Sequence, residues 1–80
     1  MKLAKLIWTQ KKKEIFLSSV ILQREELRVF NLLLDGLTYE EIAEVEHCGV
    51  KKIACIAKVI KAKYNVAQLE NPDVLEPLPE

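Results

Sequence analysis

The sequence contains few of the residues that break regular structure or cross-link it. Its 80 residues include two glycines, three prolines and two cysteines. Together with a hydrophobic content of 50%, this excludes collagen-like and low-complexity chains and favours a compact, mostly helical domain. Because no signal peptide is recognisable, the two cysteines are expected to be free thiols in a reducing cytosol.

Long apolar runs are also missing. The first residues, MKLAKLIW, hold only three consecutive apolar residues before TQKKK, which is too few for a signal-peptide core. No stretch is long enough to span a membrane. We therefore expect a cytoplasmic protein without a membrane partner, and one small enough that a dimer or another partner would help to stabilise it.

Charge is balanced over the whole chain but not along it. The formal net charge is zero, which on its own argues against binding to nucleic acid. The last eleven residues hold four acidic residues and no lysine or arginine, and without them the chain has 12 basic and 8 acidic residues, a net charge of +4. We expect residues 70–80, which contain all three prolines, to form a flexible acidic tail.

The apolar and basic residues 1–21 fit two interpretations. Their β-branched and aromatic residues would suit a hairpin, but the TQKKK loop lacks the glycine, asparagine or aspartate that hairpins favour. As a helix they give a broken apolar stripe, and we favour this interpretation. We treat residues 1–21 as an extension that is a candidate dimerisation element.

The middle of the chain predicts two helices. Leu27, Phe30 and Leu34 recur at helical spacing before the stop signal Asp35-Gly36, which predicts a helix over 24–35. Thr38 is followed three residues later by Glu41, which is the signature of a capping box. A second helix is therefore predicted over 39–46, with Leu37 and Ile42 as a hydrophobic staple and with Ala43 and Val45 facing inward.

The stretch CGVKKIACIAKVIKAKY predicts a third helix over 50–64. Its apolar positions fall on one face, and lysines occupy much of the other. An all-α domain over residues 22–69 follows, in which the short second helix and the basic third helix have the layout of a helix-turn-helix.

Residues 22–66 resemble the C-terminal DNA-binding domain of LuxR/GerE-type regulators, which NarL/FixJ response regulators also carry. The most specific matching features are Gly36, Thr38 and the triplet Glu41-Ile42-Ala43 at these distances. The DNA-binding region of sigma factors is nearly as similar. The family's fourth helix, which pairs two domains on DNA, is not expected here because Pro72 ends any helix soon after Val66.

The resemblance implies that the third helix enters the major groove of double-stranded DNA. Two lysines in the first turn of a helix oppose the macrodipole, and a phosphate backbone close to this turn would reverse that penalty. The helix lacks arginine, asparagine and glutamine for bidentate base recognition, so we expect low sequence specificity. The candidate DNA-binding residues are Thr38, Tyr39, Lys51, Lys52, Cys55, Lys58 and Lys63.

Two functions remain open at this point. The first is a small bacterial or phage transcriptional regulator that binds DNA. The second is a protein-interaction module that keeps the scaffold but docks on transcription machinery or a sensor protein, as the zero net charge and the outward Val59 would favour. No enzyme, metal or cofactor is expected, because His47, Cys48 and Cys55 supply too few ligands for zinc and His47 has no nucleophile partner.

Overall fold

The computed structural model describes residues 8–77, and these form four α-helices. They are α1 (Gln10–Ser19), α2 (Arg24–Leu34), α3 (Tyr39–Glu46) and α4 (Val50–Glu70). The predicted all-α class is confirmed: there is no strand within residues 8–77. Residues 1–7, the first part of the segment 1–21 for which we favoured a helix, lie outside the described part of the chain.

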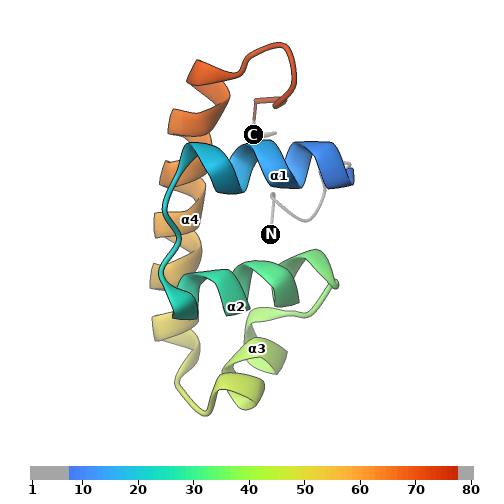
Figure 1. Cartoon of the computed structure of the whole chain (residues 1–80). Coiled ribbons are helices and arrows are strands. Elements are labelled where there is room, and N and C mark those ends of the chain that lie inside the picture. Colours follow the sequence, from blue (N-terminus) through green and yellow to red (C-terminus); the bar gives the residue numbers. More distant parts are fainter. Residues whose placement is uncertain (1–7, 78–80) are drawn as a thin grey trace.

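The longest helix, α4, organises the domain. It packs against α1, α2 and α3, and all three lie on one side of it (Figure 1). Along α4 the shorter helices follow one another, with α3 beside its beginning and α1 beside its second half (Figure 1). Because these helices gather on one side, the opposite side of α4 has no helical neighbour within residues 8–77 (Figure 1).

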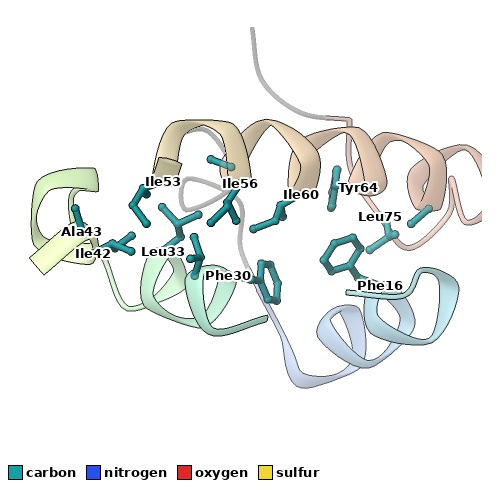
Figure 2. Packing of buried hydrophobic residues seen from close by; sticks show 13 residues of the cluster. Phe16, Phe30, Leu33, Ile42, Ala43, Ile53, Ile56, Ile60, Tyr64 and Leu75 are labelled. Carbon is teal, nitrogen blue, oxygen red and sulfur yellow. The ribbon is translucent and has the colours of Figure 1, made fainter. Parts of the chain in front are cut away.

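The core lies between α4 and the shorter helices. Ile53, Ile56 and Ile60 point from α4 toward Phe30 and Leu33 of α2 (Figure 2). Further along the same face lies an aromatic cluster. Its members, with ring centroids 5.2 to 5.8 Å apart in the contacting pairs, are Trp8, Phe16, Phe30 and Tyr64.

The segment before α2 belongs to this core. Phe16 of α1 is fully buried, and Trp8 packs against three of the other core aromatic residues. Residues 8–21 therefore share one core with the rest of the domain, and their two aromatic side chains pack in that core. This leaves Ile21, 80% exposed, as the large apolar side chain of the segment that faces outward.

The start of α3 agrees with its sequence signal. The Glu41 N–H donates to Thr38 Oγ1 at 3.2 Å, and the Thr38 N–H donates to Glu41 Oε1 at 2.9 Å. These two bonds are the predicted capping box. Ile42 and Ala43 are buried as expected, but the inward position of Val45 was wrong, since it is 52% exposed.

The predicted end of the third helix near residue 64 was also wrong. The helix α4 continues to Glu70, and Ala67 extends its buried face by another turn. Alanine is small and therefore a weak apolar signal, so the pattern of large apolar residues on the inner face ends at Tyr64. Pro72, which cannot continue a helix, follows just beyond the end of α4.

The expected flexible tail is packed over its described part. Leu75 is only 1% exposed and joins the core near Phe16 (Figure 2). Glu76 pairs with Lys12 of α1, with 2.7 Å between Nζ and Oε1, and its carbonyl oxygen accepts a hydrogen bond from the Tyr64 hydroxyl. The tail turns back after Pro72, and this turn brings Leu75 into the core.

Candidate nucleic-acid interface

A three-residue turn sets the direction of α4 relative to α3. His47 adopts the left-handed conformation, with φ 55° and ψ 47°, and ends α3. The Cys48 N–H then donates to the Ala43 carbonyl at 3.0 Å, which closes the last turn of α3. Gly49 is the N-cap of α4 and provides no side chain to cap it.

The first turn of α4 is electropositive. Its backbone N–H groups carry the positive end of the helix dipole, its N-cap has no side-chain acceptor, and it contains no acidic residue. Lys51 and Lys52 add two positive charges, and both side chains are exposed. This is an unfavourable arrangement for an isolated helix and a favourable one for contact with an anion.

Three of the predicted site residues lie on one exposed stripe. Lys51, Cys55 and Lys58 are spaced by four and three residues, so they follow one another along the same helix face. All three are exposed, as predicted. Lys52 lies to one side, where its Nζ is 3.1 Å from Oε2 of Glu25 in α2.

Thr38 and Tyr39 lie at the start of α3 and differ in exposure. Thr38 is exposed, and its hydroxyl is shared with Glu41: Oγ1 accepts the capping hydrogen bond, and the hydroxyl also bonds to the Glu41 carboxylate. Tyr39 packs against the core, and burial raises the pKa of its hydroxyl. Of this pair, Thr38 is the better placed to meet a ligand.

Lys63 is the predicted site residue that the structure separates from the others. It lies twelve residues after Lys51, roughly 18 Å along the helix at the usual rise. Its Nζ is 2.6 Å from Glu26 Oε1 and donates to the carbonyl oxygen of Ile21 at 2.7 Å. Lys63 therefore holds the chain before α2 against α4, and its ammonium group already has two protein oxygen partners.

Acidic side chains restrict how a ligand approaches the lysines. Glu40 and Glu44 of α3 are exposed and line a shallow groove with His47 and Val50, directly beside the start of α4. A polyanion that reached Lys51 from the α3 side would meet these carboxylates. An approach over the face of Lys51, Cys55 and Lys58 avoids them.

The cysteines and His47 form no evident metal centre. Within residues 8–77, no group of three or more histidine, cysteine or acidic side chains is arranged to hold a metal ion. Cys48 is half-buried against the core and Cys55 is exposed. In the same part of the chain, no helix has the length and apolar character needed to cross a membrane.

One surface feature was missed at the sequence level. Val59, Val66 and Leu69 of α4 are 41%, 53% and 78% exposed, on the side away from the core. Two of these residues lie beyond the predicted end of the helix, so their shared face was not recognised. Extending the helical pattern by six residues would have shown it.

Comparison of the chain with protein-family models, with curated proteins and with solved structures gave no match. The similarity to LuxR/GerE-type domains stays a prediction from the residues quoted above.

Proposed function

We propose that the protein binds double-stranded DNA through the beginning of α4, as a small cytoplasmic transcriptional regulator of a bacterium or phage. The observation that carries the proposal is the stripe of Lys51, Cys55 and Lys58, exposed at the electropositive end of α4 and free of acidic residues. Phosphate oxygens would accept hydrogen bonds from the lysines, and Thr38 would add a contact at the start of α3.

The proposed binding is mainly electrostatic. Lysine can address a guanine edge, whereas Ala54 and Cys55 offer only apolar contact to a thymine methyl group. Phosphate contacts do not distinguish sequences, and their strength falls steeply with salt. We therefore expect similar affinities for unrelated duplexes and a strong dependence on ionic strength.

A titration of labelled random duplex, followed by fluorescence anisotropy at several salt concentrations, tests the proposal. Lys51→Ala and Lys58→Ala should each weaken binding several-fold for every duplex and reduce the salt slope by about one. Lys11→Ala, which removes an exposed lysine from α1, is the matched control and should change neither. Binding that is absent at low salt, or equally sensitive to Lys11→Ala, would refute the proposal.

NMR spectroscopy of the same titration locates the contact. Amide shifts should be confined to Thr38, Tyr39 and residues 50–58. Lys52→Ala would be a poorer test of DNA binding than Lys51→Ala, because it also removes the ion pair between Lys52 and Glu25 of α2. Shifts centred on α1 instead would contradict the assignment.

A second candidate function rests on Val59, which is 41% exposed on the outer face of α4. In this alternative the same scaffold docks on a protein of the transcription machinery or on a sensor. Val59→Glu should then abolish partner binding while Lys51→Ala has little effect. The reverse ranking favours DNA.

A further inference from the structure

The side of α4 that faces away from the core carries a heptad pattern. Cys55, Val59, Ala62, Val66 and Leu69 are separated alternately by four and three residues, the spacing of the seam positions in a coiled coil. The core is built from the opposite face, which holds Ile53, Ile56, Ala57, Ile60, Tyr64 and Ala67. One helix thus has two apolar faces, and in the described part of the chain no helix packs on the second one (Figure 1).

The second half of this pattern is its most exposed part. Val59, Val66 and Leu69 are 41%, 53% and 78% exposed, and Ala62 between them is small enough to let another helix approach closely. Ile21, 80% exposed, lies next to this half, because a shallow groove beside α4 is lined by Ile21, Val20, Lys63 and Val66. We call Val59, Ala62, Val66 and Leu69 the outer seam.

The charges along α4 select the orientation of a partner helix. The exposed lysines Lys51, Lys52 and Lys58 lie in its first half, whereas Glu70 ends the helix and Asp73 follows it. Two such helices in antiparallel orientation place the basic half of each beside the acidic end of the other. A parallel pair would bring like charges together and align the two helix dipoles unfavourably.

We propose that two copies of this chain associate through the outer seam, with their α4 helices antiparallel. Ala62 of one copy lies opposite Val66 of the other, and Val59 lies opposite Leu69. In this register every member of the outer seam meets an apolar side chain. The proposal does not rest on DNA binding, because all four residues of the outer seam follow Lys51, Cys55 and Lys58 in the chain.

The interface is short, with four seam residues per copy, but its helices are already ordered. An isolated peptide of this length loses conformational entropy when it becomes helical in a coiled coil. Here α4 is already ordered by its packing against the core, so association does not carry that cost. We expect a reversible dimer rather than a permanent one.

Sedimentation equilibrium over a concentration series tests the dimer. The native chain should show a monomer–dimer equilibrium, and Val66→Glu should raise the dissociation constant by about tenfold or more. Val45→Glu is the matched control, because Val45 is a valine of nearly equal exposure, 52% against 53%, on α3. A native chain that is monomeric at every concentration, or equal effects of the two substitutions, would overturn the proposal.

A second variant guards against unfolding of Val66→Glu. Leu69→Lys changes the most exposed seam residue. Circular dichroism should show that this variant is folded, and sedimentation equilibrium should show that it is monomeric. A folded Leu69→Lys protein that dimerises like the native chain would contradict the outer seam as the interface.

Cysteine cross-linking tests the orientation. In a background with Cys48→Ser and Cys55→Ser, proteins carrying Val59→Cys or Leu69→Cys are oxidised separately and as a mixture. The antiparallel register brings residue 59 of one copy within disulfide distance of residue 69 of the other, so cross-linked dimers should form only in the mixture. Cross-linking of each protein with itself would show a parallel pair and reject the proposed register.

Discussion

Lys63 and Glu26 join α4 to α2, with 2.6 Å between Nζ and Oε1. Each group also bonds the chain that leads into α2. Lys63 donates to the Ile21 carbonyl at 2.7 Å, and the Gln23 N–H donates to Glu26 Oε1 at 3.0 Å. The pair therefore fixes the entry of α2 against the middle of the long helix.

Removing this lysine should destabilise the fold without weakening DNA binding. Lys63→Met keeps the aliphatic part of the side chain but leaves the half-buried Glu26 carboxylate without its charged partner. We expect the free energy of unfolding, measured by urea denaturation, to fall by about 1 to 3 kcal/mol. Lys58→Met, at an exposed position on the same helix, should change it by less than about 0.5 kcal/mol.

The same pair predicts a loss of stability in acid. The hydrogen bond from Lys63, aided by the Gln23 N–H, holds the pKa of Glu26 below its ordinary value of 4.5. The folded state therefore favours the ionised carboxylate. The resulting stabilisation is complete above the ordinary value and is lost as the pH falls through the lower, folded value.

Urea denaturation of the native chain and of Glu26→Gln at a series of pH values checks this. The glutamine variant should be less stable at neutral pH, and the difference should shrink as the pH falls below 4.5. A constant difference across the series would show that Glu26 does not contribute through its charge.

The cap of α3 should be worth a measurable amount of stability. Thr38→Ala removes the oxygen that accepts the Glu41 N–H, and such changes typically destabilise a protein by about 1 kcal/mol. Thr38→Ser keeps a hydroxyl and should recover most of the loss. Thermal unfolding followed by circular dichroism compares the three proteins, and equal midpoints would show that the cap contributes little.

Gly49→Asp should separate stability from DNA binding. Gly49 has the extended backbone typical of an N-cap, and a Cβ there would meet no atom within 4 Å. An aspartate would accept a hydrogen bond from the first turn of α4 and oppose the helix dipole, raising the free energy of unfolding by a few tenths of a kcal/mol to about 1 kcal/mol. Its charge next to Lys51 and Lys52 should weaken DNA binding several-fold, and unchanged affinity would place the DNA elsewhere.

The end of the chain should contribute to the core. Leu75→Ala empties a position that is only 1% exposed, so the free energy of unfolding should fall by about 2 to 5 kcal/mol. Trp8, the single tryptophan, packs in the same core and reports the transition by fluorescence. Val45→Ala is the exposed control, and a similar small effect of both substitutions would mean that the tail is not packed in solution.

Local signals in the sequence were sufficient for much of the fold. The bounds predicted for α2 and α3 agree with the structure to within one residue, because apolar periodicity, the Asp35-Gly36 stop and the Thr38 cap all act within a few residues of chain. The start of α4 was right for the same reason, since Gly49 stands directly before its first residue.

Predictions failed where the deciding contact lies far away in the sequence. Lys63 was assigned to phosphate, but its partner Glu26 is 37 residues earlier and is reached only because α2 packs on α4. Tail packing depends in the same way on Leu75 meeting the aromatic core built partly by α1. Neither contact leaves a local pattern.

The sequence by itself determined the helical class, the bounds of α2 and α3, the start of α4 and the separation of lysines from apolar residues along α4, because each depends on neighbours within one or two turns. Tertiary structure alone decided which lysines stay exposed and which face of α4 remains uncovered. Those outcomes depend on the side from which α1, α2 and α3 pack, and burial is a property of the assembled helices rather than of any one of them.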